Sequence, residues 1–566
     1  MILPRFKQAI RYMVKAARCL DPRSATLATH HAHTTYSDAE LLSRVEEFNQ
    51  AAERQWQSIA KDPASRSHVL GKPVSTVRDT AAIFTHIGLT LDALDLGLGH
   101  TVLDFGAGSC WLSAILNRLG VRTISMDVSP AALALGEETF RSDPRLRLDL
   151  GPKFVPYDGR RIPLKDGSVD RAVCFDAFHH VPNQDEVLGE LFRVLKTGGR
   201  LVLAEPGEGH ASTGHSKFEA DHYGVLENDL HLDDLLVRAR RAGFDGALAK
   251  PYPDPRAITL AADDYLRLSA GDHSVYPMHI LQDHLRASHT VILLKGVPGH
   301  DSRNPRELKA RITPVSDRLV TGAVGGVAEL PVRVLNLGDT TWLSAADPVG
   351  GYVYLGGHLL DGEGKLLQRG FFTCELPRDV APGENVEFIA RFHLPERLGR
   401  FRLVLDLVDE KVAWFEQCGS EVTMIEIVTD SWPDSRTPHK LRARIDVIEG
   451  RPAGTVAPGS TLALRLRIAN EGDTRWLADP DVGKGVVRLG VQVRGANGSL
   501  LQRDYFRVFL PRPVDPGDSV EIVTAVPVPE GRGRVVLALD MVAELICWFE
   551  HHGSPPVLVE VDIQSA

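Results

Sequence analysis

The stretch TVLDFGAGSCWLS, residues 101–113, constrains the fold more than any other part of the chain. It predicts a buried strand, a tight turn at Gly106 and Gly108, and a helix. Glycines let a backbone approach a ligand closely, and a helix start offers unpaired N–H groups with a partial positive charge. A second apolar run ends at Asp127, 19 residues after Gly108. Nucleotide-binding βαβ units place an acid for the ribose at about this distance, so the stretch predicts an adenosine site.

The glycine spacing distinguishes between nucleotides. A dinucleotide fingerprint needs a third small residue so that helix and strand can pack closely, and Trp111 occupies that position. The pattern Asp104-x-Gly106-x-Gly108 instead resembles motif I of the class I S-adenosylmethionine (SAM) methyltransferases. In that family the turn lies against the methionine part of SAM. Taken alone, the motif is also compatible with a βα turn that binds nothing.

Residues 162–206 carry several further motifs in order. They read IPLKDGSVDRAVCFDAFHHVPNQDEVLGELFRVLKTGGRLVLAEP and closely resemble the type-11, ubiquinone-methyltransferase-like branch of the class I enzymes. That branch has RVLKPGG where this chain has Thr197 in place of proline, which is a small departure in a loop. The resemblance covers roughly residues 40–297 and implies a Rossmann-like α/β domain that uses SAM.

The same resemblance implies which residues hold the cofactor. Asp127 would bind the ribose and Asp158 the adenine amino group, while the glycine turn would face the methionine part. Phe175 and Asp176 would close the pocket after the fourth strand. The residues expected at the cofactor are Asp104, Gly106, Gly108, Asp127, Asp158, Gly159, Phe175 and Asp176.

Catalysis of methyl transfer needs mainly alignment, because SAM carries its own leaving group. A hydroxyl acceptor also benefits from a general base. The candidates for this base follow strands four and five and are His179, His180, Glu205, Glu208, His210 and His215. We favour His210 and His215 on the acceptor side, and His180 as a further catalytic candidate whose role could equally be structural. No metal-ligating set is expected, because the six cysteines lack paired C-x-x-C spacing.

The amino-terminal segment, residues 1–38, is expected to stand apart from the catalytic domain. Residues 1–20 combine five lysines and arginines with an apolar stripe at helical spacing. This helix could lie on anionic lipid, or its apolar stripe could dock on the main domain. Beyond it, Trp56 and residues 70–85 are candidates for a lid over the cofactor.

The carboxyl half contains an internal repeat with an offset of 134 residues. The matched pairs include Asn336 and Asn470, Trp342 and Trp476, Gln368 and Gln502, Arg369 and Arg503, and Trp414 and Trp548. Short runs of alternating apolar and polar residues predict an antiparallel β-sandwich in each copy. The N-x-G-x-x-W turn resembles immunoglobulin-like modules, and the whole unit more loosely resembles β-sandwich modules attached to bacterial surface-polysaccharide enzymes.

The repeated tryptophans have two interpretations. Trp414 and Trp548 could stack on a sugar face, with the paired glutamines and arginines bonding its hydroxyls. They could instead fill the sandwich cores, which is the commoner fate of a repeated tryptophan and the one we favour. Spacing, dimerisation or partner docking are the remaining roles for the sandwiches.

Composition limits the other possibilities. The net charge of −10 argues against a nucleic-acid-binding protein, and no apolar run is long enough to span a membrane. We therefore expect a cytoplasmic, multidomain protein, with residues 1–20 as a potential peripheral contact at the inner face of the membrane. The expected units are residues 1–38, a methyltransferase domain over 39–298, and immunoglobulin-like sandwiches over 308–430 and 440–564.

The expected function is O-methylation of a sugar in a cell-surface polysaccharide or its lipid-linked precursor, with SAM as cofactor and a glycan or glycolipid as acceptor. One alternative is a small-molecule or lipid methyltransferase with scaffolding sandwiches. Another is a non-catalytic protein that binds glycans or assembles a complex. The oligomeric state is left open.

Overall fold

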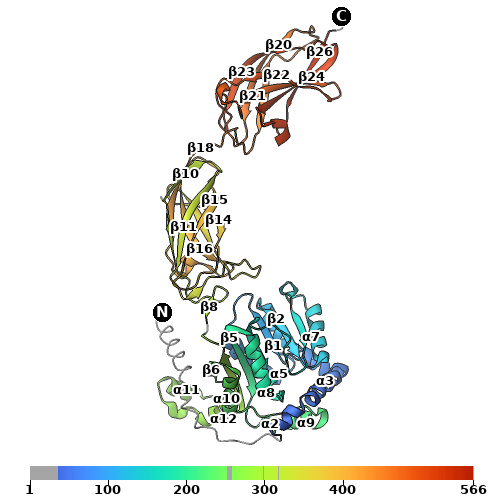
Figure 1. Ribbon diagram of the computed structural model, residues 1–566, viewed down its shortest axis with the longest axis vertical. Helices are drawn as coiled ribbons and strands as arrows, with labels where there is room; N and C mark the ends of the chain where they lie inside the picture. The colour runs from blue at the N-terminus through green and yellow to red at the C-terminus, as the bar shows by residue number, and fades with distance from the viewer. Residues whose placement is uncertain (1–35, 252–257, 298, 317, 565–566) are drawn as a thin grey trace.

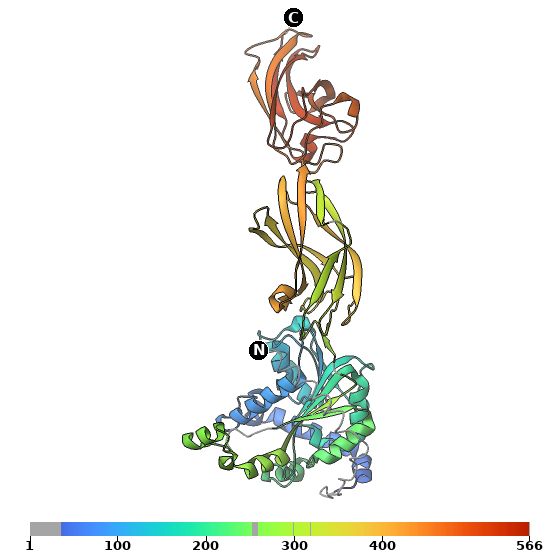
Figure 2. The same cartoon turned by 90° about the vertical axis from the view of Figure 1, so that its left-hand side faces the viewer.

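The computed structural model describes residues 36–251, 258–297, 299–316 and 318–564. The predicted helix over residues 1–20 lies outside these residues. An α/β domain stands at one end of an elongated molecule, and two β-rich units follow it in a row (Figure 1). The carboxyl terminus lies at the far end of the second β-rich unit, as Figure 2 shows from the side.

The α/β domain is built on a seven-stranded sheet with the order β3-β2-β1-β4-β5-β7-β6. Strands β1 to β5 are parallel, and β7 runs antiparallel to both β5 and β6. The strands are β1 (Thr101–Phe105), β2 (Arg122–Asp127), β3 (Lys153–Pro156), β4 (Val169–Phe175), β5 (Leu195–Pro206), β6 (Gly246–Lys250) and β7 (Ser288–Leu294). The order in which successive strands are added to the sheet reverses between β1 and β4, and open α/β sheets bind ligands at such a point. The expected Rossmann-like domain is confirmed.

Helices cover both faces of this sheet. Successive residues of β1 point to opposite faces, so Leu103 packs with α8 and α10 while Val102 packs with α5 and α6. Ser129 caps the start of α7, and Gly243 ends α10 in the left-handed conformation. The helices on the two faces are α5 (Val77–Leu94), α6 (Trp111–Arg118), α7 (Pro130–Ser142), α8 (Gln184–Val194) and α10 (Leu232–Ala242).

A further layer of helices crosses the carboxyl ends of the strands. Helix α3 packs against α4, α7 and α9. The layer consists of α2 (Asp38–Ser43), α3 (Val45–Lys61), α4 (Pro63–Leu70) and α9 (Gly214–Tyr223). Two helices, α11 (Ala262–Ser269) and α12 (Met278–Ala287), fill the stretch before β7. None of the helices in the described ranges is long and apolar enough to cross a membrane.

The first β-rich unit consists of two sheets with an apolar cluster between them. The sheet orders are β15-β11-β9 and β10-β18-β16-β13-β14, with the short β17 paired to β16. The strands are β9 (Ala310–Pro314), β10 (Leu319–Ala323), β11 (Val327–Asn336), β13 (Val353–Asp361), β14 (Leu366–Glu375), β15 (Asn385–His393), β16 (Gly399–Asp409), β17 (Ala413–Trp414) and β18 (Thr423–Ser431). A small pair, β8 (His300–Asp301) and β12 (Thr340–Thr341), closes its base.

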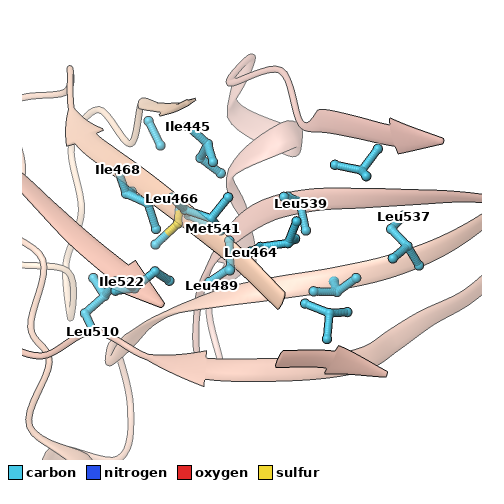
Figure 3. Packing of buried hydrophobic residues seen from close by; sticks show 14 of the residues in the cluster. Ile445, Leu464, Leu466, Ile468, Leu489, Leu510, Ile522, Leu537, Leu539 and Met541 are labelled. Atoms are coloured by element: carbon cyan, nitrogen blue, oxygen red, sulfur yellow. The ribbon is translucent and has the colours of Figure 1, made fainter. Parts of the chain in front are cut away.

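The second unit repeats this design, with sheets β19-β20-β23 and β22-β21-β24, the last strand flanked by β25 and β26. Leucine and isoleucine side chains of β20 face those of β24 in its core (Figure 3). The strands are β19 (Ala443–Glu449), β20 (Thr461–Asn470), β21 (Val487–Gly495), β22 (Leu500–Phe509), β23 (Ser519–Pro527), β24 (Gly533–Ala543), β25 (Cys547–Trp548) and β26 (Val557–Ile563).

The tryptophans at the core are not the pair that we favoured. Trp342 and Trp476 are fully buried in the clusters between the sheets. Trp414 and Trp548 lie outside both clusters, where each ring packs over a strand glycine, Gly356 or Gly490. An arginine side chain lies over each of these outer rings. Trp548 is buried, with 7% of its surface exposed, but neither Trp414 nor Trp548 fills the space between the sheets, where the prediction places them.

The first sandwich docks on the edge of the α/β sheet where its parallel strands begin. Asp347 accepts two hydrogen bonds, of 2.7 and 2.8 Å, from Arg122 at the start of β2. Arg303 pairs with Asp170 near the start of β4 at 2.9 Å. This edge lies opposite the ends of the strands that ligands approach, so the sandwiches are attached away from the expected site.

Candidate active site

A cavity of about 640 Å³ lies where the parallel strands end, beneath the layer of α3, α4 and α9. Five of the eight predicted cofactor residues line it: Gly106, Gly108, Asp127, Gly159 and Asp176. Of the predicted catalytic residues, His180 and His215 also line it. The structure thus brings most of the sequence-predicted site into one continuous space.

The glycine turn is closely packed from two sides. Both Gly106 and Gly108 have positive φ angles, of 70° and 52°. A Cβ atom on Gly106 would lie 2.6 Å from the Cβ of Ala177, and one on Gly108 would lie 2.9 Å from Cζ2 of Trp56. Any other residue would therefore strain the backbone and clash, which explains why both positions are glycine.

Asp127 is fixed by the backbone on both sides. Its Oδ2 accepts the Gly108 N–H at 2.8 Å and its Oδ1 accepts the Ser129 N–H at 2.9 Å. The residue is 7% exposed, and burial raises its pKa to about 6, with the nearby Glu53 adding to the effect. A carboxylate has about four acceptor positions, so Asp127 retains capacity for two hydroxyl groups of a ligand.

Three predicted cofactor residues, Asp104, Asp158 and Phe175, do not line the cavity. Asp104 accepts a 2.7 Å hydrogen bond from the hydroxyl of Ser113 beneath the turn, and burial raises its pKa to about 6. Asp158 accepts the backbone N–H groups of the two residues that follow Gly159 and so fixes that loop. Phe175 packs edge-to-face on Trp111. Their expected roles at the cofactor stay predictions.

Helix α3 forms the roof of the cavity. Trp56, a predicted lid residue, covers Gly108, and the Asn49 side chain covers Gly159 and donates to the Asp158 carbonyl at 3.1 Å. Glu53 accepts the Ser129 hydroxyl at 2.6 Å and a backbone N–H at the start of α7. Sequence reasoning missed Asn49 and Glu53, because nothing in a polar helix indicates which residues meet a distant loop.

At the other end of the cavity, histidines and carboxylates form a connected cluster. Glu205 is fully buried and accepts the backbone N–H groups of three consecutive residues after β4 and Nδ1 of His179 at 2.8 Å. Glu227 lies 2.9 Å from Nε2 of His210, 3.5 Å from Nδ1 of His180 and 3.9 Å from Nε2 of His179. His180 donates through Nδ1 to the Leu226 carbonyl at 2.6 Å.

Contacts within this cluster raise the pKa of one histidine and lower the pKa values of another histidine and of Glu227. Burial would lower the pKa of His179, but the hydrogen bond that it donates to Glu205 raises this pKa above its usual range. Burial together with His179 lowers the pKa of His180. Burial would raise the pKa of Glu227, but His210 and the two other histidines hold it below its usual value. At neutral pH the Glu227 carboxylate is therefore ionised and His180 is neutral.

The three predicted catalytic histidines have different surroundings. His180 faces the cavity, whereas His210 lies behind Glu227 and within 3.3 Å of the Ser216 hydroxyl. His215 stands in the first turn of α9 with its side chain 81% exposed. Glu227, which connects His179, His180 and His210, was missed because it stands alone in a loop far along the chain from the histidine pair.

Residues 103–203, which span the glycine turn, Asp127 and the histidine pair, match a family model described as a methyltransferase domain. Over these residues the α/β unit resembles methyltransferase domains. Its sequence is 32% identical over 118 residues to methyltransferase GfsG of Streptomyces halstedii, covering 20% of this chain and 40% of that protein. It is 40% identical over 116 residues to a demethylmenaquinone methyltransferase of Beutenbergia cavernae, covering 20% and 45%.

A longer match links this chain to a 37.1 kDa protein in transposon TN4556 of Streptomyces fradiae. The two are 29% identical over 264 residues, which cover 44% of this chain and 68% of that protein. The chain spans less than half the length of the two methyltransferases above, and these matches cover about a fifth of it. They therefore concern the methyltransferase domain and not the β-rich half.

Proposed function

We propose that this protein is a SAM-dependent methyltransferase that methylates a hydroxyl group of a sugar-containing acceptor. The observation that carries the proposal is the glycine turn bonded to Asp127 at the wall of a cavity, inside the segment that matches methyltransferases. The 640 Å³ of this cavity is within the range of sites for small ligands.

The residues at the turn fit SAM. The backbone of Gly106 and Gly108 would lie against its methionine part, and Asp127 has acceptor capacity left for ribose hydroxyls. SAM supplies an activated methyl group with its own leaving group. Asp176, which also lines the cavity, places a negative charge near the expected position of the sulfonium, where it stabilises the bound cation.

The far wall of the cavity supports a polar acceptor. Lys72, Asp176, His180, His215 and Glu227 all face the space, beside the aromatic rings of α9. An apolar acceptor would leave the remaining hydrogen-bonding capacity of these groups unused, and polar groups that lose hydrogen bonds in this way reject a ligand strongly. A sugar presents hydroxyls that pair with them. The His180 and Glu227 cluster then lies where a hydroxyl must lose its proton.

The proposal that the acceptor is a polysaccharide or its lipid-linked precursor rests on the β-rich half. Its sheets place β9-β11-β15 against β18-β16-β13, the order of strands A-B-E against G-F-C in immunoglobulin-like domains. We propose that both units are immunoglobulin-like and related to modules of surface-polysaccharide enzymes. Residues 1–20 would add a peripheral membrane contact, which deletion of this segment would abolish in a vesicle sedimentation assay.

A second candidate is methylation of a small molecule, with the sandwiches as a scaffold. The observation that favours it is the similarity to a relative from Beutenbergia cavernae that is a demethylmenaquinone methyltransferase. The polar far wall argues against a quinone as such, but not against a hydroxylated small molecule.

The test combines cofactor binding with methyl transfer. Purified full-length protein is titrated with SAM by calorimetry, and then incubated with methyl-labelled SAM and separated polysaccharide, glycolipid and small-molecule fractions of cell extracts. We expect label in a carbohydrate fraction, lost in Asp127→Asn and retained in the surface variant Asp149→Asn. Label in non-carbohydrate molecules supports the second candidate. SAM binding without transfer to any fraction supports a non-catalytic protein.

A further inference from the structure

The cluster at the acceptor end of the cavity has the composition of a metal site. One ring nitrogen of His179, one of His180 and one carboxylate oxygen of Glu227 all lie within 4.8 Å of one another. Two imidazoles and one carboxylate are a ligand set of catalytic zinc sites, which keep a fourth position open. We propose that His179, His180 and Glu227 bind a Zn²⁺ ion that contacts the acceptor hydroxyl.

The hydrogen bonds around His179 leave the required lone pair free. Both carboxylate oxygens of Glu205 accept backbone N–H groups, so Nδ1 of His179 is the donor across the 2.8 Å between them. Nε2 is then the ring nitrogen that remains for a metal, and metal binding releases any proton that it carries. This atom lies 3.9 Å from a carboxylate oxygen of Glu227, which is too long for a hydrogen bond. A metal cation bound between His179 Nε2 and the Glu227 carboxylate oxygen would accept both as ligands.

The separation suits zinc in size. Zinc binds imidazole nitrogen at about 2.0–2.1 Å and carboxylate oxygen at about 2.0–2.2 Å, which at a tetrahedral angle places the two ligand atoms about 3.4 Å apart. The observed 3.9 Å between His179 and Glu227 needs a shift of only about 0.5 Å to reach this geometry. His180 donates Nδ1 to the Leu226 carbonyl, which leaves its Nε2 lone pair available.

The surrounding residues provide the outer contacts that metal ligands usually have. Histidine ligands commonly donate their second ring nitrogen to a carboxylate or a backbone carbonyl, as His179 does to Glu205 and His180 does to Leu226. The ligating carboxylate is commonly hydrogen-bonded as well, and His210 lies 2.9 Å from Glu227. His210 would therefore be a positioning residue that acts through Glu227.

The open position would face the reaction space, because His180 and Glu227 line the cavity. This part of the inference rests on the proposed function. An acceptor hydroxyl bound there would have a lowered pKa and lose its proton to cavity water. Its oxygen would then form the bond to the methyl carbon while the carbon–sulfur bond of SAM breaks, leaving neutral S-adenosylhomocysteine.

The experiment measures zinc directly. Full-length protein without a polyhistidine tag is stripped with a chelator and titrated with Zn²⁺ by calorimetry, and with Co²⁺ by its visible absorption. We expect one tight equivalent, a tetrahedral Co²⁺ spectrum, and at least a hundredfold weaker binding in Glu227→Gln. The matched control is Glu219→Gln, which removes another cavity carboxylate outside the cluster and should retain the equivalent. Thermal melting of each variant checks that it folds.

Two further outcomes separate this inference from the proposed function. Wild-type protein that binds SAM and transfers methyl groups at full rate after chelation, with no tight Zn²⁺ equivalent, overturns the metal site and leaves the methyltransferase intact. A Zn²⁺ affinity equal in wild type and Glu227→Gln also overturns it. One zinc equivalent in a protein that binds no SAM supports the site and rejects the methyltransferase proposal.

Discussion

The ionisation of Asp127 should control SAM binding and domain stability in opposite directions. The ribose hydroxyls of SAM need an ionised acceptor, but burial raises the pKa of Asp127 to about 6. Below that pH the protonated form loses acceptor capacity. We therefore expect the dissociation constant for SAM to rise about tenfold between pH 7.5 and pH 5.0, since only about a tenth of a group remains ionised one pH unit below its pKa. Calorimetry at pH 5.0 and 7.5 measures this.

The folding stability contributed by Asp127 changes with pH in the opposite direction to the SAM affinity. An unfolded aspartate has a pKa near 3.9, so between about pH 4 and pH 6 the folded state binds a proton that the unfolded state has lost. Stability contributed by this group is therefore present at low pH and is lost as pH rises through about 6. The loss is about 3 kcal/mol in total, at about 1.4 kcal/mol per unit of pKa.

The variant Asp127→Asn isolates both effects. It cannot titrate, so its SAM affinity should be weak and equal at both pH values. Between pH 4.5 and 7.5 its stability relative to wild type should rise by about 2 kcal/mol, measured by hydrogen exchange of the β1 and β2 amides. Asparagine cannot accept from both Gly108 and Ser129, but that loss is the same at each pH. A wild-type SAM affinity that does not change between the two pH values would refute the reasoning.

Three further predictions follow from packing. Gly108→Ala should weaken SAM binding strongly because its Cβ meets Trp56, and Trp56→Ala in the same chain should partly restore binding in a calorimetric double-mutant cycle; no coupling would contradict the contact. Arg122→Asp should broaden the spin-label distances between the methyltransferase domain and the first sandwich, and adding Asp347→Arg should narrow them again. Trp476→Ala should cost the second sandwich about 3–5 kcal/mol in chemical denaturation, whereas Trp548→Ala outside the core cluster should cost clearly less.

Local chemistry made the methyltransferase half predictable. The turn at Gly106 and Gly108 has left-handed backbone angles that glycine adopts freely, and Ser129 caps the helix that follows Asp127. These features depend on neighbours in the sequence, so the sequence displays them. The sequence around Glu227 carries no such signal, because its place in the site depends on contacts with three histidines from two other loops.

The internal repeat contained the information needed to place the tryptophans correctly, although its periodicity alone did not. Both tryptophan pairs recur with the same offset, so periodicity does not distinguish the core pair from the outer pair. The strand glycines distinguish the two tryptophan pairs. Gly356 and Gly490 recur inside strands β13 and β21, where a glycine indicates close approach by another group. That group is the ring of Trp414 or Trp548, on the face of the sheet away from the core cluster.

The position of the sandwiches limits which acceptors they could recognise. They dock through Asp347 and Arg303 at the edge where the parallel strands begin, whereas the cavity lies at the opposite edge. Strand β1 alone separates these edges by about 16 Å, at about 3.3 Å for each of its five residues. A small acceptor in the cavity therefore cannot touch a sandwich. A polymer could reach both.

This separation yields a direct test of the acceptor. If the acceptor is a polysaccharide held by the sandwiches, removing residues 432–564 should raise KM for the polymer and leave kcat on a short oligosaccharide unchanged, because the cavity stays intact. The truncation falls beyond β18. Within the described ranges no backbone hydrogen bond joins residues 300–431 to residues 435–564, so the first sandwich should remain folded. Equal KM for polymer and oligosaccharide before and after truncation would assign the second sandwich a scaffolding role. The acceptor would then be recognised by the cavity alone.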